Sequence, residues 1–186
     1  MKFFKKPAVA VILVIILVIA STLLSFEIRF GSKCQQISDG FFDGIYVDGE
    51  LRPSCASIVK KIIGYAEEIR AIAFENGLDT ESLDSDLESL KYSIKYSDPD
   101  ASYVYFCYND VLNSLGNLKS SLKTANISSE DSESISQLYL QINSAAREFD
   151  TTGYNESVRA FLRDYDRFPV SKFYWYTNVI MPSCFE

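Results

Sequence analysis

The chain of 186 residues has a net charge of −7, is 47% hydrophobic and 14% aromatic, and contains no histidine. This apolar content excludes wholesale disorder, and the length provides for one ordinary domain beside a membrane segment. The acidity argues against a nucleic-acid partner, and the lack of histidine removes the commonest general base and zinc ligand. We therefore expect no enzyme activity, no metal site and no cofactor.

An uncharged apolar run, AVAVILVIILVIASTLLSF, occupies residues 8–26. Because a helix rises 1.5 Å per residue, the run can cross a hydrocarbon core of about 30 Å. It predicts a transmembrane signal-anchor helix over 8–26, behind a basic tail over 1–7. A cleaved secretory signal is the alternative, because Val18-Ile19-Ala20 has the small-residue spacing that signal peptidase accepts. The run continues to Phe26, beyond the usual signal core, and this favours a retained anchor.

The charges around this run predict its direction across the membrane. The basic residues before it are Lys2, Lys5 and Lys6, and those soon after it are Arg29 and Lys33. The positive-inside rule favours a cytoplasmic N-terminus. We expect a single-pass protein of the cell membrane whose remaining residues, 27–186, form an extracytoplasmic domain.

Four cysteines lie in the predicted domain: Cys34, Cys55, Cys107 and Cys184. Outside the cytoplasm they permit two disulfides in three pairings, and they can equally remain reduced. Cys34 and Cys107 fall on apolar stripes, where a cysteine is more often a small core residue than a bridge. The sequence leaves the pairing open.

The first part of the domain reads as two helices separated by turns. Apolar residues at steps of three and four over 30–45 predict that the membrane helix continues outward. Asp48-Gly49 and Arg52-Pro53 are turn sequences. Ser54 or Ser57 can then cap a second helix.

The second helix is predicted to end at Asn76-Gly77. Residues 78–100 are acidic and weakly periodic, and predict an excursion with a short surface helix. A third helix follows, with a coiled-coil-like stripe typical of bundle core: Val104, Tyr108, Val111, Leu115, Leu118 and Leu122. A fourth helix begins near Ser128 and its apolar stripe reaches Phe149. The sequence therefore predicts an all-α fold, an antiparallel bundle of about four long helices after the transmembrane helix.

The apolar pattern shifts phase after the fourth helix and resumes at Tyr154. Thr151-Thr152-Gly153 therefore predicts a kink or local bulge rather than the end of the helix, which continues to Phe168 and stops at Pro169. Four aromatic residues follow over 173–176. They suit either an aromatic belt at the membrane surface or a plug at the end of the bundle.

Several motifs together resemble the LemA family of bacterial membrane-anchored proteins. The terminal block is YNESVRAFLRDYDRFPVSKF, in which Tyr154-Asn155, Tyr165-Asp166 and Phe168-Pro169 are similar to the family's closing motif. Further features similar to the family's are Val59-Lys60-Lys61-Ile62-Ile63-Gly64-Tyr65-Ala66, the leucines between Leu112 and Leu122, and a final Cys184-Phe185-Glu186 in place of the family's aromatic-Phe-Glu end. Residues 50–57 depart from its pattern. The resemblance implies an antiparallel helical bundle on an N-terminal membrane helix, without established enzymatic activity.

Two functions fit these observations, and neither is catalytic. The first is a non-enzymatic envelope protein whose helical ectodomain organises other proteins or the membrane surface, with an unidentified protein partner and possible homo-oligomers. The alternative is a ligand-binding or sensing ectodomain with a pocket between helices, lined by Tyr154, Tyr165 and Trp175 near the kink. A polar network within the bundle is a structural interpretation of Tyr65, Arg70, Arg147, Tyr154, Asn155 and Asp166. We assign no catalytic, cofactor-binding or metal-binding residues.

Overall fold

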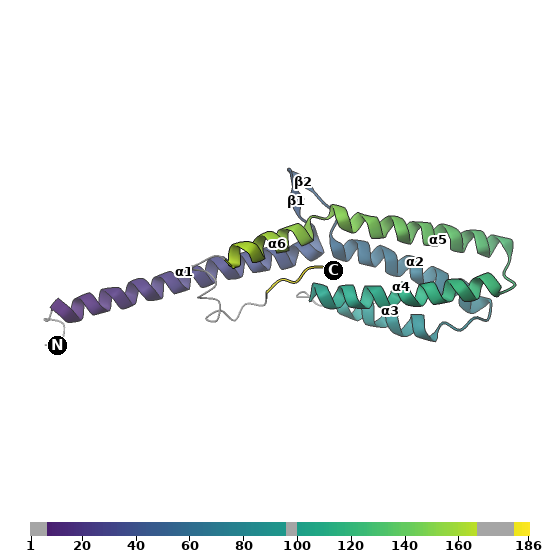
Figure 1. Cartoon of the computed structure of the whole chain (residues 1–186), viewed down its shortest axis with the longest axis horizontal. Helices are drawn as coiled ribbons and strands as arrows, with labels where there is room; N and C mark the ends of the chain where they lie inside the picture. The colour runs from purple at the N-terminus through teal and green to yellow at the C-terminus, as the bar shows by residue number, and fades with distance from the viewer. Residues whose placement is uncertain (1–6, 96–99, 167–180) are drawn as a thin grey trace. The chain divides into compact units, whose positions relative to one another are not determined.

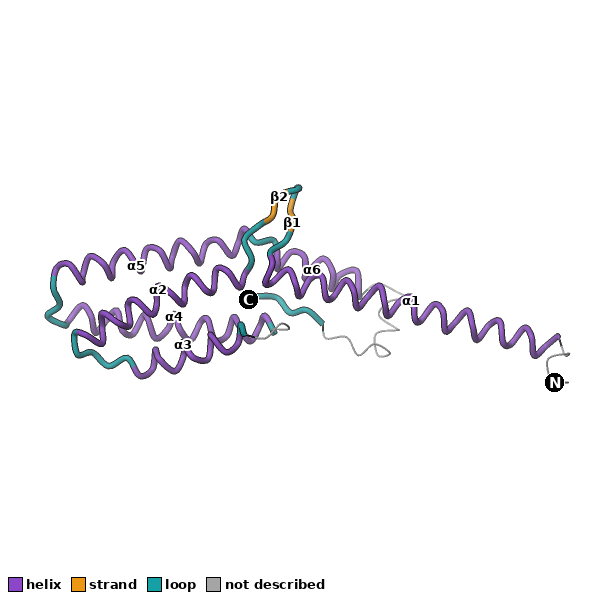
Figure 2. The backbone as a smooth tube through the Cα atoms, turned by 180° about the vertical axis from the view of Figure 1, so that it is seen from behind, coloured by secondary structure: helices purple, strands orange, loops and turns teal. Residues whose placement is uncertain are grey.

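The structure is a computed structural model that describes residues 7–95, 100–166 and 181–186. It divides into two compact units: unit 1 contains Met1–Gln36 and Leu162–Met181, and unit 2 contains Ile37–Phe161 and Pro182–Glu186. Helices dominate both units, and the described residues include only one small β-hairpin (Figures 1 and 2). The prediction of an all-α fold is confirmed.

Unit 1 contains most of the long helix α1 (Pro7–Asp43). The most apolar 18-residue stretch of α1 has a mean hydropathy of 3.0 and is 0% buried. Among the described helices, α1 alone is long and apolar enough to cross a membrane. A signal sequence near an N-terminus has the same properties. After the apolar run, the ring of Phe30 packs 5.2 Å from that of Tyr165, and the exposed Lys33 and Asp164 pair at 4.0 Å.

A tight hairpin joins α1 to the bundle in unit 2. Strands β1 (Tyr46–Val47) and β2 (Glu50–Leu51) pair antiparallel around the predicted Asp48-Gly49 turn. Both turn residues have positive φ, 53° and 84°, as a two-residue type I′ hairpin requires.

Helix α2 (Cys55–Glu75) has the ends that the sequence predicts. The Ser54 hydroxyl oxygen accepts a hydrogen bond from the Ser57 amide at 3.1 Å, and this caps the first turn. Gly77, with φ of +73°, follows the last turn, where a left-handed residue commonly ends a helix. The buried face comprises Cys55, Ala56, Ile58, Val59, Ile62, Ile63, Ala66, Ile69 and Ala73.

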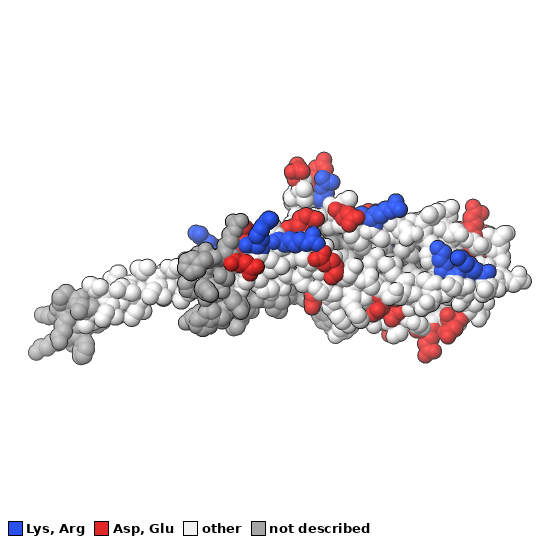
Figure 3. All heavy atoms as spheres, viewed as in Figure 1, with Lys and Arg blue, Asp and Glu red and all other residues white. Residues whose placement is uncertain are grey.

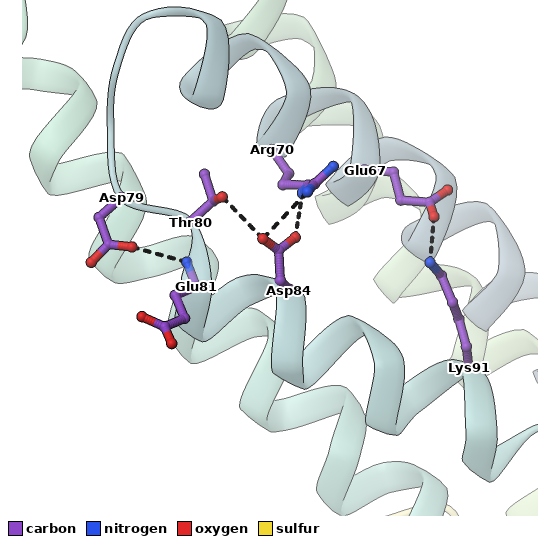
Figure 4. A network of polar contacts seen from close by, with 7 residues as sticks. All are labelled: Glu67, Arg70, Asp79, Thr80, Glu81, Asp84 and Lys91. Atoms are coloured by element: carbon purple, nitrogen blue, oxygen red, sulfur yellow. Dashed lines mark hydrogen bonds and ion pairs between the residues drawn. The ribbon is translucent and has the colours of Figure 1, made fainter.

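Helix α3 (Glu81–Ser93) is a full member of the bundle, so the prediction of a surface excursion was wrong. Leu83, Leu87 and Leu90 are each 2% exposed or less. Their spacing of four and three residues makes a narrow apolar stripe on an otherwise acidic helix. Ion pairs fix its outer face to α2: Arg70 pairs with Asp84, and Glu67 with Lys91 at 2.6 Å (Figure 4).

Helices α4 (Ala101–Thr124) and α5 (Ser129–Glu148) complete the bundle. Helix α4 packs on α3, α5 packs on α2, and α2 also contacts α3 and α4. The start of α2 meets the chain just after α5 through Cys55 and Thr152, while Asn76 at its end bonds to Asp131 at the start of α5. These contacts show that α2 and α5 are antiparallel.

The predicted continuation of the fourth helix through residues 151–153 was wrong. Helix α5 ends at Glu148, a 3-10 turn η2 follows (Phe149–Thr151), and a separate helix α6 begins at Tyr154 (Tyr154–Tyr165). Gly153 has φ of +72°, which the L residues of an α-helix do not adopt. The buried Thr152 hydroxyl donates to the Phe149 carbonyl at 2.9 Å and accepts from the Tyr154 amide at 3.3 Å, and so holds the break.

Candidate functional site

The seam between α4 and α5 is hollowed into a groove. Because α5 packs chiefly on α2 and α4 packs chiefly on α3, the backbones of α4 and α5 come close to each other at few points. The groove is an open cavity of about 350 Å³, lined from α4 by Lys119, Leu122 and Lys123 and from α5 by residues between Ser132 and Asn143. At 1.5 Å per residue, this part of α5 is about 17 Å long. A second open cavity, of about 590 Å³, shares Leu140 and Asn143, but its described lining residues all belong to α5 and to the turn that follows it. Figure 1 shows the seam, with α4 and α5 in front of α2.

The groove has an apolar floor and a partly exposed apolar wall. Leu122 and Ile135 lie at its floor and are 4% and 6% exposed. Leu140 lines both cavities and is 61% exposed, outside the buried stripe of α5. An exposed leucine alone is ordinary, but here it lies in a concave surface beside other apolar residues.

Tyr139 links the two walls of the groove. Its hydroxyl donates to the Leu115 carbonyl of α4 at 2.7 Å, and the Lys119 ammonium lies 4.5 Å from its ring centre. Burial raises the pKa of Tyr139 to about 12, so the phenol is neutral at physiological pH. The contact with lysine is therefore a cation–π interaction with a neutral ring.

The smaller cavity is lined by basic, neutral polar and apolar residues. Its charged residues are Lys119 and Lys123, one turn apart on α4, and no carboxylate lines it among the residues that the structure describes. The larger cavity adds Arg147 and Asp150. Figure 3 shows basic side chains near the far end of α4 and a largely uncharged surface between α4 and α5. The groove is thus locally basic in a chain of net charge −7.

A second candidate site, which we call the tail slot, is the part of unit 2 that surrounds residues 183–186. Phe185 is 5% exposed. Its ring centre lies 4.6 Å from that of Phe149, 5.1 Å from Tyr105, 5.9 Å from Tyr108 and 6.0 Å from Phe41. These rings come from the end of α1, the start of α4 and the turn after α5.

Polar side chains of the tail slot bind the main chain of the tail. Asn155 donates to the Phe185 carbonyl at 3.0 Å and accepts from the Phe185 amide at 2.7 Å. The Tyr154 hydroxyl donates to the Ser183 carbonyl at 3.2 Å, and the Ser102 hydroxyl to the Cys184 carbonyl at 3.3 Å. An exposed ion pair between Arg159 and Glu186 lies at the edge.

The residues that the sequence suggests for a polar network do not form one network in the structure. Arg70 pairs with Asp84, Arg147 lines the larger cavity, and Tyr154 with Asn155 binds the tail. Tyr65 is half-buried on α2, and Asp166 is exposed. Two of the aromatic residues proposed for a pocket near the kink are described: Tyr154 is buried against the tail, and Tyr165 packs on Phe30 in unit 1. The third, Trp175, lies outside the described residues together with the rest of the 173–176 cluster.

All four cysteines are free thiols, and Cys34, Cys55 and Cys107 are buried. Cys55 donates to Thr152 at 3.7 Å, and burial raises its pKa to about 11. A thiol that stays protonated and buried is chemically inert. The core interpretation of Cys34 and Cys107 agrees with their burial.

The sequence analysis missed both the groove and the tail slot as sites. The signal for the groove was present in Leu140, which breaks the stripe of α5, and in the pair Lys119 and Lys123. A comparison with family models, curated proteins and solved structures finds no match to this chain.

Proposed function

We propose that this protein is a non-enzymatic, single-pass membrane protein of the bacterial envelope, of the LemA type, whose bundle binds a protein partner in the groove between α4 and α5. The occupant we propose is an acidic amphipathic helix of another protein. The observation that carries the proposal is the groove itself: it is about 17 Å long, it has apolar residues at its floor, and its described lining residues include two lysines and no carboxylate.

The shape of the groove favours a helix as its occupant. An amphipathic helix places apolar side chains at positions i, i+3 or i+4, and i+7 into a groove between two helices. About three turns of helix match the groove length. The exposed Leu140 lies at the end of the groove that adjoins the larger cavity on α5. Burying one leucine side chain fully contributes about 1.5–3 kcal/mol.

The charge of the groove favours an acidic partner. Lys119 and Lys123 lie on the α4 wall, so carboxylates along one edge of a docked helix would face them. Rim charges of this kind contribute chiefly to association rate and to discrimination between partners. A basic helix would meet like charges in the same place, which excludes it.

The exposed apolar part of α1 supports the membrane anchor. Large apolar side chains from Val11 to Ile19 have no cover from the rest of the described chain. We propose that lipid covers them, with the N-terminus cytoplasmic and the domain over 27–186 outside. The intact mass of protein purified from membranes tests the anchor. A mass that includes residues 1–20 supports it, whereas a mass that lacks them identifies a cleaved signal.

Photocrosslinking in living cells tests the groove. The photoreactive residue p-benzoylphenylalanine replaces Leu140, and in the matched control it replaces Phe74, which is 66% exposed on α2 and lines neither cavity. We expect a crosslink specific to position 140 that peptide mapping places on an acidic amphipathic helix. Equal crosslinking at both positions, or a crosslink to a second copy of this chain or to a basic segment, would refute the proposed occupant.

A further inference from the structure

The tail slot has the features of a peptide-binding site in addition to buried aromatic packing. Three of its side chains, Tyr154, Asn155 and Ser102, bond to main-chain atoms of residues 183–185. The Asn155 amide satisfies both the donor and the acceptor of one residue, which is the arrangement that an extended peptide offers. Binding through the main chain accepts any sequence, so specificity must come from the side chains of the bound segment.

Two side chains of the segment supply that specificity. Phe185 enters a box of four aromatic rings with centre-to-centre distances of 4.6–6.0 Å. Aromatic pairs at such distances contribute beyond their buried area. Glu186 follows and pairs with Arg159. The slot therefore selects an aromatic residue followed by an acidic one.

We propose that the tail slot is a peptide-binding site for an aromatic–acidic segment, and that it accepts residues 183–186 from a second copy of this chain as well as from its own. The hydrogen bonds, ring contacts and ion pair described above are all made with these few residues. The same segment from another copy therefore offers the same hydrogen bonds, the same ring contacts and the same ion pair. Exchange of an identical element between protomers is a low-cost route to association.

The tail of each chain competes for that chain's own slot, and this competition limits exchange between copies. A tethered segment has a high effective concentration, so free peptide competes poorly with the chain's own tail. Weakening the tail of one molecule, without changing the slot, should open the slot to a segment supplied from outside. Phe185→Ala does this, because the aromatic anchor leaves while the box and Asn155 remain.

The first experiment measures binding of a fluorescent peptide, Met-Pro-Ser-Cys-Phe-Glu, to the full-length Phe185→Ala protein in detergent by anisotropy. We expect saturable binding that is at least tenfold weaker for a peptide with alanine in place of phenylalanine. We expect a similar loss for the protein carrying both Phe185→Ala and Asn155→Asp, because the aspartate lacks the amide donor. Equal binding of the two peptides, or no binding by a folded Phe185→Ala protein, would overturn the peptide site.

The second experiment keeps the tail and tests exchange directly. Full-length protein with p-benzoylphenylalanine at position 185 is reconstituted in vesicles with a mass-tagged wild-type copy, at low and high protein density. Crosslinks from position 185 to α4 or α6 of the tagged copy, increasing with density, support exchange. Crosslinks confined to the same chain at every density overturn it. This readout does not depend on the groove between α4 and α5.

Discussion

The most informative stability prediction concerns Phe185→Ala compared with Phe106→Ala. Phe185 is 5% exposed and surrounded by four rings, whereas Phe106 is 61% exposed on α4. Truncating a fully buried phenylalanine commonly costs about 3–5 kcal/mol, and truncating an exposed one changes stability by less than about 0.5 kcal/mol. We expect the tail to undock without unfolding of the bundle, which limits the loss for Phe185→Ala to about 2–4 kcal/mol.

Urea unfolding of the full-length protein in detergent, followed by circular dichroism, measures both losses. The two variants remove the same atoms from the same residue type, so their difference reports burial alone. Equal midpoints for the two variants would refute the conclusion that the tail is part of the unit 2 core. A loss for Phe185→Ala above about 5 kcal/mol would show that the tail is needed for the bundle to fold.

Three further predictions use the same unfolding measurement. Gly44→Ala should destabilise by more than Gly49→Ala, because both glycines have positive φ but only at Gly44 would a Cβ meet a backbone oxygen, that of Arg52. Equal losses would contradict this close approach. The free energy of unfolding should fall as pH rises from about 9 to 11. Burial raises the pKa of Cys55 from 9.0 to about 11, so the folded state holds the thiol proton more tightly than the unfolded state does. Cys55→Ala should flatten this part of the pH profile, and an unchanged slope would refute the contribution of Cys55. Asp84→Asn, which removes an ion pair shown in Figure 4, should cost less than about 1 kcal/mol, because the pair is partly exposed, and the loss should shrink at high salt.

The elements with strong local signals could be predicted from the sequence. Helix α2 has an N-cap serine, an unbroken apolar face and a glycine after its last turn, and each of these acts within a few residues. The hairpin turn at Asp48-Gly49 has the same local origin. Helix α3 was underestimated because its three leucines are sparse among acidic residues, and only the packing of α4 against it shows that they are core.

The sites could not be predicted because they depend on contacts between distant segments. The groove exists because α5 packs on α2 rather than on α4, and periodicity within a helix does not specify its neighbour. The tail slot joins Asn155 to Phe185 across thirty residues.

The measurement that tests the central claim most directly is the effect of charge on crosslinking from position 140. Lys119→Glu with Lys123→Glu reverses the charge of the α4 wall, and Lys60→Glu with Lys95→Glu makes the same change in net charge at exposed positions that line neither cavity. We predict that the first pair lowers the crosslink yield about tenfold, as expected if each reversed rim charge costs about 0.7 kcal/mol, and that the second pair leaves it unchanged. An unchanged yield for the first pair, or an equal loss for both pairs, would contradict an acidic helix bound in the groove.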